Sequence, residues 1–222
     1  MQLRETLRAR HSTRAFSSRP VDDALLRSLV DDAREAPSWS NTQPYRVALA
    51  SGALCDALRQ ELVAASMTRL PSPEAAWPSQ YPPVLQSRRR ATGYGLYAAL
   101  GIDRQDSEAR ARQFQRNYEM FDAPAAIFLF AHTALGEYAA LDAGCFLMAL
   151  LLSATDKGLG SCAQAALACY PDVVRARFDI DDEWRLLCGV AIGYEEESAV
   201  NAFRPARASV DELVVPPRSS ST

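Results

Sequence analysis

The sequence predicts an α+β fold in which helices outnumber strands. Most segments repeat apolar residues at helical spacing, whereas only a few are short and continuously apolar, as strands in a core are. The predicted strands also do not alternate strictly with helices. A layered α+β arrangement is therefore favoured over a doubly wound parallel sheet.

The bulk properties indicate a soluble protein with one core. The chain has 222 residues, of which 48% are hydrophobic and 23% are charged, so we expect one domain over residues 1–217. A formal net charge of −3 argues against nucleic acid as a partner. Five cysteines without a Cys-x-x-Cys pair indicate reduced thiols in the cytoplasm, and two histidines predict no metal site.

The first elements are helix, helix, strand and helix. A short amphipathic helix opens the chain and ends near Arg10, and its polar start carries no targeting signal. Asp22 or Asp23 caps a second helix, which Pro37 stops. The next two elements are a strand at 46–50 and a helix at 53–66.

The middle of the chain is harder to interpret. Residues 67–85 are rich in proline, which predicts an irregular lid or wrapping arm. Arg88 to Arg90 open a helix that continues through Tyr97, and a further helix is predicted for 107–118.

Two strongly apolar elements follow. The run 125–131 is bounded by Pro124 and His132 and fits a central strand. A helix over 138–156 is apolar almost all round, although its longest apolar run is too short to span a bilayer. Such a helix needs extra cover in a small protein, and a twin helix across a symmetric dimer would supply it.

The remaining predictions concern the last third of the chain. We expect a strand or extended loop at 161–164, a helix at 171–178, a strand at 186–194, an extended apolar segment at 213–215 and a disordered tail at 218–222.

Two polar segments carry the functional signal. In Arg10-His11-Ser12-Thr13-Arg14, two guanidinium groups bracket hydroxyl groups, a combination that suits a phosphate dianion. The loop from Pro37 to Pro44 has a side-chain amide on either side of Thr42, which suits the polar edge of a flat heterocycle. The pair indicates a bound flavin mononucleotide (FMN).

These segments and three later blocks make the chain resemble the nitroreductase family of FMN-dependent, NAD(P)H-using enzymes. The blocks follow the family's order from residue 3 to about 215. The stretch from Arg88 to Pro124 looks like the branch that includes nitrobenzoate and nitroaromatic reductases. The matching blocks are residues 10–16, 36–44, 158–166, 189–194 and 201–207.

The resemblance implies a nitroreductase-like fold and a homodimer with two FMN sites at the subunit interface. It implies a mainly antiparallel central sheet flanked by helices. Each C-terminal segment would add an edge strand to the sheet of the partner. That exchange would explain the apolar Leu213-Val214-Val215, which alone would form an exposed sticky edge.

The resemblance also implies roles for the polar segment. Arg10, Ser12 and Arg207 match phosphate anchors. Arg14 matches a basic position near the pyrimidine side of the flavin, where a cation stabilises negative charge on the reduced ring. His11 contributes backbone and packing contacts.

Two further sets match parts of the family that contact the flavin ring. The first reaches the flavin of the partner subunit, although Trp39 can equally fill core. The second points backbone N–H groups at flavin N5 and O4, and departs from many relatives only at Ala163, where they carry proline. The sets are Pro37, Ser38, Trp39 and Asn41, and then Gln164, Ala165 and Ala166.

Aromatic and basic residues of the middle are weaker candidates. Trp77, Tyr81, Tyr118 and Phe121 would line a substrate channel or, as an alternative, pack in core or interface. Arg88 to Arg90 would steer anionic substrates or the phosphate of NADPH, or simply form a solvated helix face.

The implied activity is a ping-pong oxidoreductase. NAD(P)H would pass a hydride to flavin N5, and a nitroaromatic or quinone acceptor would take it from the same face. No protein nucleophile or acid/base residue is predicted. The alternatives are reductive dehalogenation, ene reduction or flavin fragmentation on the same fold, or a flavin-binding sensor or storage protein without turnover. The sequence does not identify the acceptor or the preferred nicotinamide nucleotide.

Overall fold

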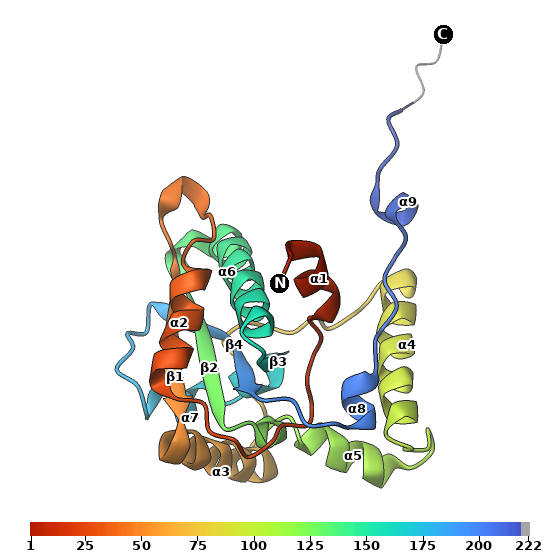
Figure 1. The fold of residues 1–222 in the computed structure, drawn as a ribbon, viewed down its shortest axis with the longest axis horizontal. Helices are drawn as coiled ribbons and strands as arrows, with labels where there is room; N and C mark the ends of the chain where they lie inside the picture. The colour runs from red at the N-terminus through yellow and green to blue at the C-terminus, as the bar shows by residue number, and fades with distance from the viewer. Residues whose placement is uncertain (219–222) are drawn as a thin grey trace.

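A central antiparallel sheet organises the molecule. The computed structural model describes residues 1–218, so residues 219–222 of the predicted tail lie outside it. The strand order is β1-β2-β4-β3, with antiparallel pairing throughout (Figure 1). This confirms the mainly antiparallel sheet. The strands are β1 (Tyr45–Ser51), β2 (Ala125–His132), β3 (Gly160–Gln164) and β4 (Trp184–Gly193).

Helices cover both faces of the sheet, and β2 is buried between them. Phe128 and Phe130 belong to the core under α3 (Gly52–Thr68), whereas Ile127 and Leu129 belong to the core shared with α6 (Gly136–Asp156). Successive side chains of a strand point to opposite faces, so a strand covered on both sides must be apolar throughout. The predicted central strand is confirmed.

Helix α6 forms one layer with α2 (Asp23–Ala33). An 18-residue window of α6 has a mean hydropathy of 1.6, enough by length and composition for a membrane span, yet the helix packs on the sheet. Its other face exposes Tyr138, Leu141 and Met148. The apolar helix expected at 138–156 is confirmed, and it has an uncovered face.

Two helices stand outside these layers. Neither α4 (Pro83–Ala99) nor α5 (Ser107–Gln115) contains a buried residue. Helix α4 begins before the expected position because Pro83 occupies its first turn, where a missing N–H costs nothing. Helix α5 ends at Gln115, before the expected Tyr118, because the N–H groups of Asn117 and Tyr118 donate to carbonyl oxygens three residues back and form turns.

The segment after Phe203 departs from the expected extended form. A capping box between Ser209 and Glu212 starts a short helix, α9 (Val210–Leu213), so Leu213 lies in a helical turn. Val214 and Val215 are exposed beyond it, and the chain end rises away from the body (Figure 1).

The remaining helices are short. The predicted helix at 171–178 stops at Arg175. They are α1 (Leu3–Ala9), η1 (Trp39–Asn41), η2 (Met120–Asp122), η3 (Thr133–Leu135), η4 (Ala165–Ala168), α7 (Pro171–Arg175) and α8 (Ala199–Ala202).

All five cysteines are free thiols, and only Cys145 is partly exposed.

Candidate cofactor site

The Arg10–Arg14 segment lies along the start of β3. Ser12 forms a parallel bridge with Ser161, and the N–H of Thr13 donates to the Ser161 carbonyl oxygen at 3.0 Å. Glycine is favoured at 160, because a Cβ there would meet Thr13 Oγ1 at 2.6 Å. The backbone of the arginine segment is therefore fixed against an edge strand.

Asn201 joins this segment to the C-terminal part of the chain. Its side chain is 2% exposed, and its Oδ1 accepts from the N–H groups of Arg14 at 2.7 Å and Ala15 at 3.2 Å. Its Nδ2 donates to the Ala15 and Glu196 carbonyl oxygens at 2.8 and 2.9 Å. A buried amide with three backbone partners fixes both segments.

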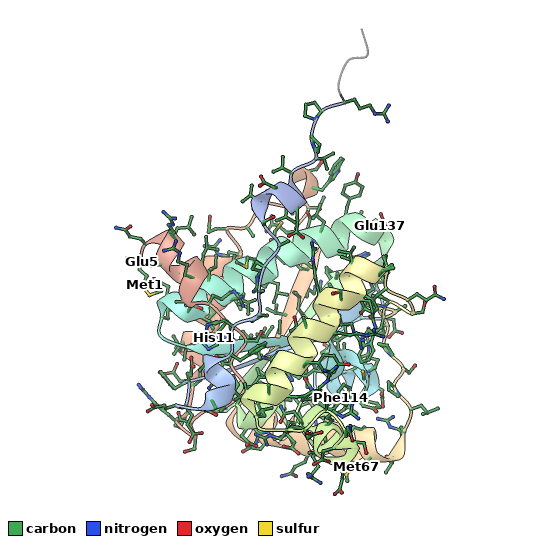
Figure 2. The ribbon with its side chains drawn as sticks, turned by 90° about the vertical axis from the view of Figure 1, so that its right-hand side faces the viewer. Met1, Glu5, His11, Met67, Phe114 and Glu137 are labelled. Carbon is green, nitrogen blue, oxygen red and sulfur yellow. The ribbon has the colours of Figure 1, made fainter. Side chains whose placement is uncertain are left out.

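A cavity of about 630 Å³ opens between these segments, α1, α4 and α6. Five arginines line it, namely Arg8, Arg10, Arg14, Arg204 and Arg207, and Figure 2 shows His11 beside α1 on this side of the molecule. Within residues 1–218, no carboxylate lies within 4.0 Å of any of the five guanidinium groups. We call this the arginine cavity.

The electrostatics of the arginine cavity favour an anion. Burial, and then the positive charges of Arg207 and Arg204, lower the pKa of Arg10. Like charges held together without a counter-ion repel one another, and a bound anion would relieve that repulsion. Arg10, Ser12 and Arg207, which were expected to lie together, all line this one cavity.

Arg204 is a site residue that sequence reasoning missed. It lines the arginine cavity and donates to the Phe203 carbonyl oxygen at 3.1 Å. Arg207 donates to the Pro205 carbonyl oxygen at 2.9 Å, which leaves further N–H donors on both groups. The available signal was the spacing Arg-Pro-Ala-Arg, which puts two cations beside one short turn.

His11 contributes to two cavities. It lines the arginine cavity and also a second cavity of about 360 Å³ on the side of Thr13. Its Nδ1 lies 2.9 Å from the Ala9 carbonyl oxygen and its Nε2 lies 3.1 Å from Glu195 Oε1. These two contacts hold the imidazole ring of His11 between the end of α1 and Glu195.

The end of β3 presents small residues at the sheet edge. Ala163 and Ala165 are exposed, whereas Gln164 is 4% exposed and Ala166 is 8% exposed. Gln164 Nε2 donates to the Asn117 carbonyl oxygen at 2.9 Å, and the buried Gln164 Oε1 has no partner among the residues the structure describes. A flat ring could approach this backbone closely.

The Pro37–Asn41 loop lies elsewhere. Trp39 packs against Tyr138 in the first turn of α6, with ring centroids 4.6 Å apart and the rings tilted by 50°. Neither Pro37, Ser38, Trp39 nor Asn41 lines the arginine cavity. One chain therefore does not bring the two polar segments together.

Four aromatic candidates for the substrate channel divide into two kinds. Trp77 and Tyr81 are exposed, but neither lines the arginine cavity. Tyr118 and Phe121 are 3% and 2% exposed and belong to the main core, where Tyr118 packs against Tyr170 with ring centroids 5.7 Å apart. This burial fits the packing alternative for Tyr118 and Phe121, and a channel role stays a prediction.

The basic run of α4 is partly neutralised. Arg88 forms an ion pair with Glu212 at 2.6 Å, and Arg89 lies over the ring of Tyr81 at 5.2 Å. Arg88 also lines a cavity of about 290 Å³ that shares Arg204 and Arg207 with the arginine cavity.

Comparison with protein families gives a match over most of the chain. Residues 7–194 match the model of the family described as "Nitroreductase family". The chain is 32% identical over 200 residues to a 4-nitrobenzoate reductase of Pseudomonas putida, covering 90% of this chain and 88% of that one. It is 35% identical over 208 residues to nitroreductase NfnB of Mycolicibacterium smegmatis, covering 93% and 88%.

Solved structures show the same likeness. An FMN- and NADPH-dependent nitroreductase NfnB from Sphigopyxis sp. superposes with a TM-score of 0.91 at 36% identity, covering 98% of this chain and 100% of that one. The FMN-dependent NfnB from Mycobacterium smegmatis in complex with NADPH gives a TM-score of 0.91 at 34% identity, covering 97% of both chains.

Proposed function

The chain belongs to the nitroreductase family, and from that membership we propose that it is an FMN-dependent oxidoreductase that uses NAD(P)H to reduce nitroaromatic or quinone acceptors. The relatives named above support this, since they are a nitrobenzoate reductase and FMN- and NADPH-dependent nitroreductases. The observation that carries the proposal is the arginine cavity, whose five guanidinium groups lack a carboxylate partner in the described part of the chain.

The arginine cavity fits the phosphate of FMN. Guanidinium groups bind phosphate oxygens in pairs and stay charged at any working pH. Arg10, Arg204 and Arg207 would hold the dianion, with the Ser12 hydroxyl donating a further hydrogen bond. The lowered pKa of Arg10 supports this assignment, because burial and then the positive charges of Arg207 and Arg204 make its charged form one that a bound anion would stabilise.

The end of β3 fits the flavin ring. Exposed Ala163 and Ala165 leave the backbone accessible to a flat ring. Arg14 would stabilise negative charge on the pyrimidine side of the ring. When bound, FMN supplies hydride transfer from NAD(P)H to the acceptor in two half-reactions that use one open face.

The homodimer remains part of the proposal. The Pro37–Asn41 loop does not reach the arginine cavity of its own chain, and a second copy would bring it to that site. The uncovered face of α6, with Tyr138, Leu141 and Met148, offers an apolar surface for this contact.

The C-terminal exchange completes the dimer. Strand β1 is an edge strand, and a cavity of about 520 Å³ runs along it beside α2. The exposed Val214 and Val215 would pair with this edge in the partner, because extended segments add readily to open sheet edges.

We place this single domain of residues 1–217 in the cytoplasm. The free thiols support that placement, since oxidising compartments favour disulfides.

The test begins with purified protein. We expect a yellow protein whose bound FMN is bleached anaerobically by NADPH or NADH and recovers when a nitroaromatic or quinone is added. Substituting Arg10→Ala or Arg207→Ala should release the flavin. Arg19→Ala is the matched control, because Arg19 lies over the Tyr194 ring at 3.7 Å, outside the arginine cavity.

Other outcomes favour other functions. A flavin that neither nucleotide bleaches would indicate a sensor or storage protein. Flavin that is reduced but passes hydride only to halogenated phenols or enones would indicate dehalogenation or ene reduction. A protein that binds no FMN would end the proposal.

A further inference from the structure

Asp142 on α6 is a buried carboxylate without a cation. It is 5% exposed, and no Lys, Arg or His nitrogen of residues 1–218 lies within 4.0 Å of it. A buried unpaired carboxylate is costly, so its retention needs a reason. The α6 helix around it is otherwise strongly apolar.

Its hydrogen bonds identify the reason. The only donor to Asp142 in the described part of the chain is the backbone N–H of Trp39, which lies 3.1 Å from Oδ1 and 3.0 Å from Oδ2. Both carboxylate oxygens therefore serve one backbone group in the Pro37–Asn41 loop.

The loop needs such support. Ser40, Asn41 and Gln43 have φ angles of 49°, 55° and 48°, a left-handed conformation that costs energy for residues other than glycine. Strained residues of this kind persist only where the surroundings fix them. Within the loop, the N–H of Gln43 donates to Ser38 Oγ at 2.9 Å.

Asp142 and Tyr138 both hold Trp39 from one face of α6, and we call this pair of contacts the clamp. Tyr138 precedes Asp142 by one helical turn, and its ring packs against the Trp39 ring in a tilted arrangement with centroids 4.6 Å apart. Helix α6 thus holds Trp39 by its backbone N–H and by its indole ring. Because Asn41 follows two residues later, the clamp sets where its amide can reach.

We propose that Asp142 is a positioning residue that holds the Pro37–Asn41 loop of one subunit in the form that contacts the flavin of the other. The proposal rests on the proposed function, since it requires an FMN site and a dimer. It adds a residue outside the cavity that acts on the site only through Trp39.

Three variants separate the hydrogen bond from the charge and from the fold. Asp142→Leu removes the acceptors, and we expect the Kd for FMN to rise about tenfold or more, as the loss of a charged hydrogen bond implies. Asp142→Asn keeps an acceptor oxygen and should recover most of that affinity. Ser153→Ala is the control, because it removes a hydrogen bond at 2.6 Å from α6 to Asp32 without touching the loop.

Two further variants test the Trp39 donor directly, in case Asp142→Leu fails to fold. Trp39→Pro deletes the N–H, and its predecessor Ser38 is already extended (φ −140°, ψ 159°), as a residue before proline must be. Trp39→Ala deletes the ring and keeps the N–H. Weaker FMN binding in Trp39→Pro than in Trp39→Ala supports the clamp, and equal binding contradicts it.

Mixed dimers test whether the loop acts across the interface. Differently tagged Arg10→Ala and Asp142→Leu chains are combined, and the mixed dimer is isolated. One of its sites then carries both changes and the other carries neither, so about half of the wild-type FMN content and turnover should return. A destabilised fold alone would not restore one site in two, and the melting temperature of each variant checks that separately.

The outcomes are distinct. Wild-type protein without FMN overturns the proposed function. Wild-type protein with FMN, together with an Asp142→Leu variant of unchanged Kd and kcat, overturns the role of Asp142. Mixed dimers that form but recover no FMN overturn action across the interface.

Discussion

Gly160 and Thr13 are in contact so close that any side chain on the first residue of β3 would force a shift. A Cβ on Gly160 would lie 2.6 Å from Thr13 Oγ1 and 2.8 Å from its Cγ2. Thr13 is fully buried between Ser12 and Arg14, so such a shift would disturb the packing of the arginine segment. This contact ties the position of the arginines to the sheet.

Gly160→Ala should therefore reduce both stability and cofactor affinity. Overpacking of this kind typically costs about 1–3 kcal/mol. Thermal unfolding and FMN titration measure the two effects. Gly93→Ala in α4 is the control, because its Cβ meets nothing within 4 Å and alanine is the better helix former. Equal behaviour of the two variants would contradict the packing argument.

Arg204→Gln should weaken FMN binding, because Arg204 lines the arginine cavity beside Arg10. The substitution removes one of the charges beside Arg10, and charge-assisted hydrogen bonds contribute about 1.5–3 kcal/mol each. Titration at low and high salt measures the change, and the salt dependence should decrease with the lost charge. Arg204→Lys should retain part of the affinity. An unchanged Kd for Arg204→Gln would remove this residue from the phosphate site.

Tyr118→Ala should behave as a core substitution. Tyr118 is 3% exposed, and burial raises the pKa of its hydroxyl, so removal of the ring should cost about 3–5 kcal/mol. Urea unfolding measures this loss. Tyr81→Ala, at an exposed position, should leave stability nearly unchanged. A Tyr118→Ala protein of normal stability and altered acceptor preference would restore the channel role.

Stability should decrease in alkaline solution because of two buried thiols. Burial raises the pKa of Cys55 from 9.0 to about 11 and that of Cys188 from 9.0 to about 12. The folded state thus holds these protons more tightly than the unfolded state. The stabilisation is complete below about pH 9 and is lost as the pH rises toward the folded values.

Urea unfolding from about pH 8 to about pH 10 tests this, with a slope of up to about 1.4 kcal/mol per pH unit for each thiol. Cys55→Ala and Cys188→Ala should each flatten the slope. A slope that neither substitution changes would assign the alkaline loss to other groups.

Val214→Asp combined with Val215→Asp should weaken the dimer. Both side chains are largely exposed in the single chain, and carboxylates would disfavour their pairing with a sheet edge. Analytical ultracentrifugation over a range of concentrations measures the shift toward monomer. Val84→Asp, an equally exposed valine in the first turn of α4, is the control. A double variant that remains as dimeric as the wild type would contradict strand exchange.

The sequence predicted the buried elements well because their patterns have one physical cause. Strand β2 is covered on both faces and must be apolar throughout. Helix α6 packs one face on the sheet, and its opposite face is also apolar although it is uncovered. Helix boundaries were less accurate. Pro83 reads as a breaker in a proline-rich stretch, although proline is also favoured in the first turn of a helix.

Other features had weak or absent signals. The spacing of Ser209 and Glu212 is a capping box, so α9 could have been predicted. The left-handed φ angles of Met120, Phe121 and Asp122 have no sequence signal, because glycine or asparagine would be expected there. The site residues Arg10, Ser12 and Arg207 come together across nearly the whole length of the chain, where Asn201 binds the backbone of Arg14 and Ala15.

The meeting of Arg10 and Arg207 in one cavity has a consequence for how the protein unfolds. A phosphate held by both would act as a removable cross-link between the two ends of the chain. Because the ligand leaves when the chain unfolds, it does not restrict the unfolded ensemble as a covalent cross-link would, and it stabilises the folded state by mass action. Proteases should then cut the cofactor-free protein first near its termini, at α1 and after Phe203, while the sheet between them remains intact.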